Sequence, residues 1–137
     1  MNTAGYSKTP LSKKLGFKEG FVVRLINPPP YYNDLFEYLP NDIVYQEETH
    51  ELNDLIHYFE TDAKLMTQTL GQLKNEIKQN GMIWVSWPKK ASKVPTDIIE
   101  DTIRNHALKI GLVDIKVCAV DEVWSGLKLV IPVKNRK

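Results

Sequence analysis

Two tryptophan-bearing segments contain the residues of this chain whose types and spacing suit binding chemistry. The first runs from Trp87 through Pro88 to a pair of lysines, and the second surrounds Trp124. Indole rings offer flat apolar walls, lysines offer positive charge, and aspartate and serine offer directional hydrogen bonds. These groups suit a small anionic or aromatic ligand, or an acidic segment of a protein partner. The candidate ligand-binding residues are Trp87, Lys89, Lys90, Ser92, Asp121, Trp124 and Ser125.

The same residues allow two interpretations that involve no small ligand. In one, the tryptophans close the end of a hydrophobic core, and a nearby lysine forms an ion pair with Asp121 or Glu122. In the other, the tryptophan loops form an interface with another protein, and the chain has a structural or regulatory role. The residue types alone do not choose between these interpretations.

No arrangement of nucleophile and base accompanies these segments, so the sequence predicts no catalytic residues. None of the serines near them lies in the Gly-x-Ser-x-Gly turn that exposes a serine nucleophile. The one cysteine, Cys118, falls on a predicted strand, where a buried and unreactive thiol is expected. Whether the protein is an enzyme stays open, and the sequence favours a role without catalysis.

Metal binding is not predicted either. The histidines His50, His57 and His106 form no i,i+4 pair and have no cysteine at zinc-ligand spacing. His57 lies among apolar residues of a predicted strand, which is typical of a hydrogen-bonded histidine in a core.

Length and composition limit the architecture and the partners. With 137 residues, 42% of them hydrophobic, the chain is expected to form one domain over residues 1–137. We expect residues 1–19 to form an N-terminal arm with a short helix, and residues 133–137 to be a frayed tail. A net charge of +1 argues against nucleic acid as a partner. The sequence shows no secretory signal and no membrane-spanning apolar run, so a cytoplasmic location without membrane contact is expected.

Hydrophobic patterning predicts strands that alternate with helices. Continuous apolar runs predict buried strands over residues 21–26, 55–59 and 82–87, and a brief strand is expected over residues 42–45. Alternating apolar residues over 113–119 and 127–131 predict two half-exposed strands at the sheet margin, joined by a short turn around Trp124.

Four helices are expected, one before the first strand and three between strands. Capping signals predict a short helix over residues 9–16 and another after Asn33-Asp34. A long helix is expected after Asp62, ending at Asn80-Gly81, and a further one from Thr96-Asp97 to Gly111. Their apolar stripes are Met66, Leu70, Leu73 and Ile77 in the first, and Ile99, Ile103, Ala107 and Ile110 in the second.

This element order predicts a three-layer, Rossmann-like α/β fold. Strands separated by helices indicate a mostly parallel sheet, and the short final turn indicates a C-terminal antiparallel hairpin. The arrangement is similar to that of methyltransferases, but truncated. The strands ending at Trp87 and Val120 are expected to share a direction, so the two tryptophan segments would meet at the carboxyl edge and line one pocket. The segment around Tyr6 is expected to fold over this edge.

The loop after the first strand departs from the usual nucleotide-binding pattern. Cofactor sites of this architecture use a glycine-rich turn there, because glycine lets the backbone approach the ligand. Residues 27–32 read Asn-Pro-Pro-Pro-Tyr-Tyr, and proline has no backbone N–H to offer a phosphate. We therefore predict no cofactor. A methyltransferase-like transferase with a rebuilt donor site remains an alternative.

Several longer motifs resemble those of a bacterial family of small uncharacterised proteins, the domain of unknown function three-zero-five-two. The resemblance covers nearly the whole chain and implies no established activity and no catalytic residues. It rests on residues 5–7, 9–11 and 13–16, on Trp87-Pro88-Lys89-Lys90 with Ser92, and on residues 113–122 and 124–127.

Overall fold

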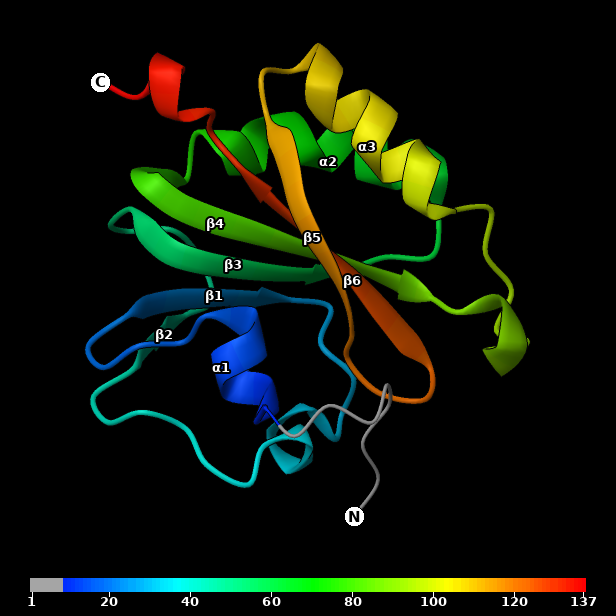
Figure 1. Cartoon of the computed structure of the whole chain (residues 1–137), viewed down its shortest axis with the longest axis horizontal. Coiled ribbons are helices and arrows are strands. Elements are labelled where there is room, and N and C mark those ends of the chain that lie inside the picture. Colours follow the sequence, from blue (N-terminus) through cyan, green and yellow to red (C-terminus); the bar gives the residue numbers. More distant parts are fainter. Residues whose placement is uncertain (1–8) are drawn as a thin grey trace.

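The structure, a computed structural model, describes residues 9–137 and places a twisted sheet between two helical layers (Figure 1). The segment around Tyr6 lies outside the described residues. The strands are β1 (Val22–Ile26), β2 (Val44–Gln46), β3 (Asn53–Phe59), β4 (Ile77–Pro88), β5 (Val113–Ala119) and β6 (Trp124–Val130). The helices are α1 (Leu11–Leu15), α2 (Ala63–Lys74) and α3 (Glu100–Lys109), with short 3₁₀ turns η1 (Tyr32–Leu35), η2 (Lys90–Ser92) and η3 (Val133–Asn135).

The strand order within the described chain is β2-β1-β3-β4-β6-β5. The first four strands are parallel, whereas β6 runs antiparallel to both β4 and β5. Strand β5 therefore points the same way as β4, and the carboxyl ends of both lie at one edge of the sheet. The predicted Rossmann-like fold class and the antiparallel C-terminal hairpin are confirmed. The structure adds that β6 lies inside the sheet, between β4 and the edge strand β5.

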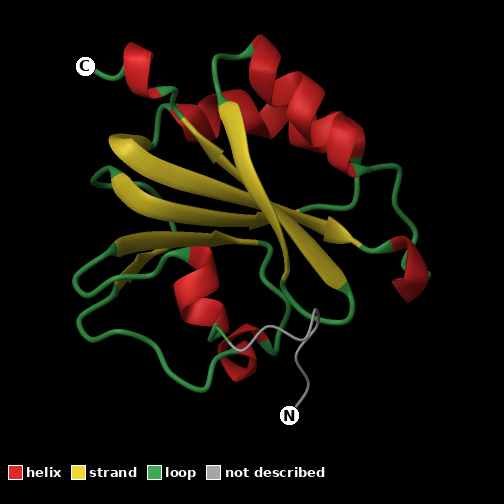
Figure 2. Ribbon diagram, viewed as in Figure 1, coloured by secondary structure: helices red, strands yellow, loops and turns green. Residues whose placement is uncertain are grey.

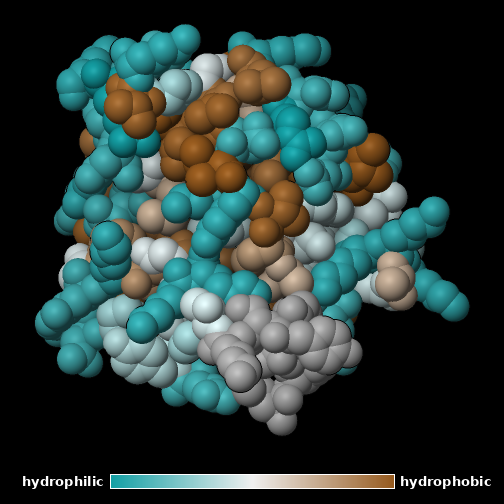
Figure 3. All heavy atoms as spheres, viewed as in Figure 1, coloured by the Kyte–Doolittle hydropathy of each residue, from teal (hydrophilic) through white to brown (hydrophobic). Residues whose placement is uncertain are grey.

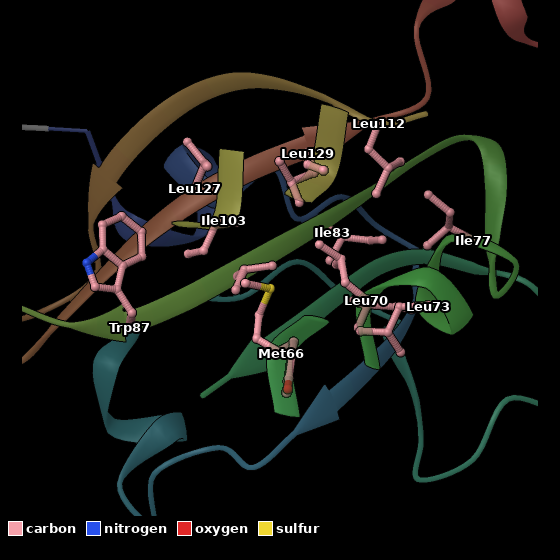
Figure 4. Packing of buried hydrophobic residues seen from close by; sticks show 14 of the residues in the cluster. Met66, Leu70, Leu73, Ile77, Ile83, Trp87, Ile103, Leu112, Leu127 and Leu129 are labelled. Carbon is pink, nitrogen blue, oxygen red and sulfur yellow. The ribbon is translucent and has the colours of Figure 1, made fainter. Parts of the chain in front are cut away.

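Each face of the sheet has its own hydrophobic core. Helices α2 and α3 cover one face (Figure 2), and Figure 4 shows Met66, Leu70 and Ile103 packed there against strand residues. Helix α1 covers the other face, where Leu15 and Trp84 belong to a second buried cluster. The Trp84 indole N–H donates to the Leu15 carbonyl at 2.7 Å, which fixes the end of α1 on the sheet. We call these two sides the α2/α3 face and the α1 face.

The boundary between α2 and β4 differs from the predicted one. The helix ends at Lys74, and Ile77 is the first residue of β4, so Asn80-Gly81 lie inside the strand. The β3–β4 register shifts here, because Asn53 pairs with Ile77 but Leu55 pairs with Met82. Ile77 is buried in the same cluster as Leu73. Helical spacing could not reveal the change to a strand, since either conformation buries the Ile77 side chain.

The helix predicted after Asn33-Asp34 is only the 3₁₀ turn η1, and the chain is extended at Phe36. Phe36 and Leu39 contact the α1-face core individually. The prediction was wrong because capping residues start a turn, whereas a longer helix needs a sustained apolar stripe, which this segment lacks.

Three further apolar residues of the predicted helix and strand patterns are exposed. Helix α3 begins at Glu100, and the buried residue before it is Ile98, whereas Ile99 is 64% exposed. On the edge strand β5, Ile115 and Val117 are also exposed, and Cys118 faces the α1-side core instead. A position just before a helix does not follow the helical period, and an edge strand is not covered on both faces.

The Trp84–Leu15 hydrogen bond predicts unequal effects of two similar tryptophan substitutions. We expect Trp84→Phe to lower the free energy of unfolding by about 1–3 kcal/mol more than Trp87→Phe, since it leaves the buried Leu15 carbonyl without its partner. Both indoles are buried, so the loss of packing volume is matched. Equal losses in chemical denaturation would show that this bond does not hold α1 in place.

Candidate functional site

The two tryptophan segments lie side by side at the carboxyl edge of the sheet. Pro88 pairs with Trp124 and Trp87 pairs with Ser125 across the β4–β6 ladder. Beyond the ladder, the Lys89 backbone N–H donates to the Val123 carbonyl at 2.7 Å. The shared strand direction thus brings the lysine loop and the Asp121 turn together.

The two indoles, however, lie on opposite faces of the sheet. Trp87 is 8% exposed and packs into the α2/α3 core, near Met66 and Leu127 (Figure 4). Trp124 pairs with the neighbouring residue Pro88, so it faces the α1 side, where its ring lies edge-on to Phe59 at 5.0 Å. The predicted pocket with both indoles as walls is therefore wrong. Strand direction decides which ends meet, but side chains alternate between faces, and positions 87 and 124 are out of phase.

Asp121 organises the turn that contains Trp124. Its Oδ1 accepts the backbone N–H groups of Val123 at 2.8 Å and Trp124 at 2.7 Å. The Tyr31 hydroxyl also interacts with this carboxylate. Burial, followed by the hydrogen bond and the negative charge of Asp121, raises the pKa of Tyr31 to about 12, although a hydrogen bond with Trp124 acts in the opposite direction. Tyr31 is thus a protonated phenol at neutral pH, and it connects the loop after β1 to the Asp121 turn.

Tyr31 was not among the candidate site residues predicted from the sequence. Its position five residues after the end of β1 places it at the same sheet edge as those residues, and this position could have indicated it. Its neighbour Tyr32 is buried and belongs to a different group of side chains.

A buried polar chain lies beneath this edge on the α1 face. The Tyr32 hydroxyl is 3.0 Å from His57 Nδ1, and His57 Nε2 is 2.7 Å from the Ser86 hydroxyl. Phe59 stacks on the His57 ring at 4.2 Å. Burial lowers the pKa of His57 to about 3, so the ring is neutral at physiological pH. The predicted hydrogen-bonded core histidine is confirmed, and Ser86 is enclosed with it.

The lysine loop is a short turn stabilised by Ser92. The Ser92 hydroxyl donates to the Lys89 carbonyl at 2.6 Å and accepts the Val94 N–H at 3.2 Å. Lys90 is exposed, and Lys89 is half-buried. Among residues 9–137, neither lysine belongs to an ion pair, so the predicted alternative pairing with Asp121 or Glu122 is not formed.

The proline loop at the end of β1 is fixed by hydrogen bonds to the neighbouring strand and within the loop. Asn27 has a left-handed backbone (φ 55°), and its side-chain amide donates to the Phe59 carbonyl at 3.2 Å. Pro29 is buried, and its carbonyl accepts the Tyr32 N–H at 2.9 Å. Asparagine therefore adopts the conformation for which a glycine is usually needed. The three prolines that follow offer no backbone donors.

Metal and membrane features are absent from the part of the chain that the structure describes. Residues 9–137 contain no cluster of three His, Cys, Asp or Glu side chains that could bind a metal ion. Within the same residues, no helix combines the length and the apolar character that a membrane crossing requires.

Solved structures with the same arrangement define the class of fold. A SAM-dependent methyltransferase from Aquifex aeolicus is 17% identical, with a TM-score of 0.61 over 87% of this chain and 86% of that chain. A ribosomal protein L11 methylase from Lactobacillus delbrueckii subsp. bulgaricus is 11% identical, with a TM-score of 0.57 over 88% and 74%. Magnesium protoporphyrin IX methyltransferase from Synechocystis PCC 6803, solved with bound SAM, is 9% identical, with a TM-score of 0.57 over 88% and 74%. At these identities the similarity shows a Rossmann-like methyltransferase fold and nothing about activity.

The family is shown by the sequence itself. Residues 12–133 match the family described as protein of unknown function (DUF3052), and the chain belongs to this family. No curated protein matches the chain at a significant level.

The buried His57 predicts a specific loss of stability in acid. Because its pKa falls from 6.5 to about 3 on folding, the unfolded state takes up a proton below pH 6.5 while the folded state does not. Its stabilising effect is complete above pH 6.5 and declines as the pH falls towards 3. Between about pH 7 and about pH 5, the stability difference between wild type and His57→Gln should shrink by about 2 kcal/mol.

Comparing the two proteins cancels the titration of carboxylates common to both. Urea denaturation at the two pH values gives the difference directly. A difference that does not change with pH would show that His57 is not held neutral in the folded protein.

Proposed function

We propose that this small cytoplasmic protein binds a small anionic or aromatic ligand at the carboxyl edge of its sheet, without catalysing a reaction. The proposed site lies on the α1 side of that edge. Trp124 provides the aromatic wall, Lys89 and Lys90 provide positive charge, and Asp121 provides hydrogen bonding. Trp87 and Ser92 contribute indirectly. Trp87 packs into the α2/α3-face core at the end of β4. The Ser92 hydroxyl stabilises the turn that carries Lys89 and Lys90.

The observation that supports this proposal most is the joining of three loops around one carboxylate. Asp121 contacts Tyr31 from the β1 loop, and the neighbouring Val123 carbonyl is bonded to the lysine loop. Two backbone N–H groups and a phenol share the charge of Asp121. Among the described residues, neither Lys89 nor Lys90 belongs to an ion pair. Pre-ordered loops reduce the entropy lost on binding.

We expect Ser125, unlike the other candidate residues, to have a structural role in the sheet. It pairs with Trp87 on one side and Ala119 on the other, inside the β4–β6–β5 ladder. It is expected to maintain the position of the turn rather than to contact a ligand. An acidic segment of a protein partner would use the same lysines and the same aromatic wall.

The chain has three tryptophans, which makes the site testable by the indole N–H signals in a nitrogen–proton NMR spectrum. With indole-3-acetate as the probe, we expect the Trp124 signal to shift saturably while those of Trp84 and Trp87 stay in place, because both are buried. Lys89→Gln/Lys90→Gln should weaken binding about tenfold by removing the charge that faces the carboxylate.

The matched control is Lys64→Gln/Lys109→Gln, which removes two exposed lysines from α2 and α3. Equal weakening by the control would mean that only net charge matters. No saturable Trp124 shift with indole-3-acetate or with simpler aryl carboxylates would count against the proposed site.

Methyl transfer is a second candidate function, and the fold similarity favours it. It requires a donor site rebuilt around Asn27 and the following prolines, since this loop provides few backbone donors. Calorimetric titration with S-adenosylmethionine separates the two candidates. A saturable heat of S-adenosylmethionine binding that Asn27→Ala reduces would support a rebuilt donor site. If no heat is observed, ligand binding without methyl transfer remains as the proposed function.

A further inference from the structure

Two lysines face each other across the last pair of strands. Lys116 of β5 pairs with Lys128 of β6, and like charges in directly opposed positions destabilise a sheet. Lys128 pairs on its other side with Trp84 of β4, and the Lys116 ammonium lies 6.0 Å from the Trp84 ring centroid. Both lysines are thus on the α1 face, close to the indole that holds α1.

Two more lysines approach this pair from α1 and the turn after it. Lys14 is adjacent to Leu15, whose carbonyl accepts the Trp84 indole N–H. Lys14 acts electrostatically on Cys118 together with Lys116 and with Lys89 of the carboxyl edge. The positive charge of Lys18 likewise acts electrostatically on Lys128. Burial and then the charges of Lys116 and Lys18 lower the pKa of Lys128. We call Lys14, Lys18, Lys116 and Lys128 the lysine cluster.

No carboxylate among residues 9–137 forms an ion pair with a lysine of this cluster. The ion pairs of the described chain join Arg24 to Glu76, Lys78 to Asp54, and Arg104 to three acidic side chains. Figure 3 shows hydrophilic side chains lying between hydrophobic ones across the middle of the molecule in this view.

We propose that the lysine cluster binds a small ligand with two or more phosphate groups, held between α1 and the β5–β6 strands. One phosphate would bridge the opposed Lys116 and Lys128, and a second would meet Lys14 and Lys18. The cluster is distinct from the carboxyl-edge site, since Lys128 is four residues further along β6 than Trp124.

The size of the cluster and the charge of the chain favour a small ligand over a nucleic acid. Four ammonium groups match the charge of a di- or triphosphate, whereas a net charge of +1 provides little long-range attraction for a polyanion. Binding also removes the repulsion between Lys116 and Lys128, so the anion should stabilise the folded state.

The probe for this site is inorganic tripolyphosphate, with orthophosphate and sulfate compared at equal ionic strength. We expect tripolyphosphate to raise the melting temperature saturably and more than either comparison anion. Lys116→Gln/Lys128→Gln should weaken tripolyphosphate binding about tenfold or more, while the exposed pair Lys64→Gln/Lys109→Gln should retain it. Without ligand, Lys128→Met should melt at or above the wild-type temperature, because the like-charge contact is gone.

Each other outcome overturns the proposal. Equal stabilisation by sulfate would mean an ionic-strength effect, and equal weakening in the control pair would mean nonspecific attraction. Tighter binding of a single-stranded oligonucleotide than of tripolyphosphate would assign the cluster to a nucleic acid. Because Lys116→Gln/Lys128→Gln should leave the indole-3-acetate shift of Trp124 unchanged, failure of this site is distinguishable from failure of the carboxyl-edge site.

Discussion

The pairing of β4 with β6 is the interaction on which the rest of the structure depends. The ladder extends from Met82–Val130 to Pro88–Trp124, and the Lys89–Val123 hydrogen bond continues it beyond the strands. This antiparallel pairing places β6 inside an otherwise parallel sheet, and it sets the direction of β5. It therefore brings the lysine loop to the Asp121 turn. Without it, neither the carboxyl-edge site nor the lysine cluster would be assembled.

The alternation of side chains along β4 then assigns each residue to one face. Trp87 and Val85 belong to the core under α2 and α3, whereas Trp84 and Ser86 face α1. The bond from Trp84 to Leu15 fixes α1, a helix too short to be stable alone. As a result the α1 face has two adjacent regions, an aromatic edge around Trp124 and the lysine cluster nearer the middle of the sheet.

Much of this fold could be predicted from the sequence because hydrophobic period and turn residues report directly on local structure. The central strands, α2, α3 and the final hairpin follow from them. Three features of the strand boundaries and of the candidate site could not be predicted. Ile77 fits both a helix stripe and a buried strand, so the start of β4 was missed, and the face of Trp124 depends on its register against β4, which no local pattern encodes. The role of Tyr31 likewise depends on a contact with Asp121, ninety positions later in the chain.

Amide hydrogen exchange at Lys89 tests the central claim most directly. This backbone N–H lies beyond the last ladder residue, and its partner is the Val123 carbonyl at 2.7 Å. If the β4–β6 pairing extends into the two loops, the Lys89 amide should be protected nearly as well as the amides of the central strand, while that of the exposed Lys90 exchanges freely. Equally fast exchange at Lys89 and Lys90 would contradict the joining of the two loops and the site built on it.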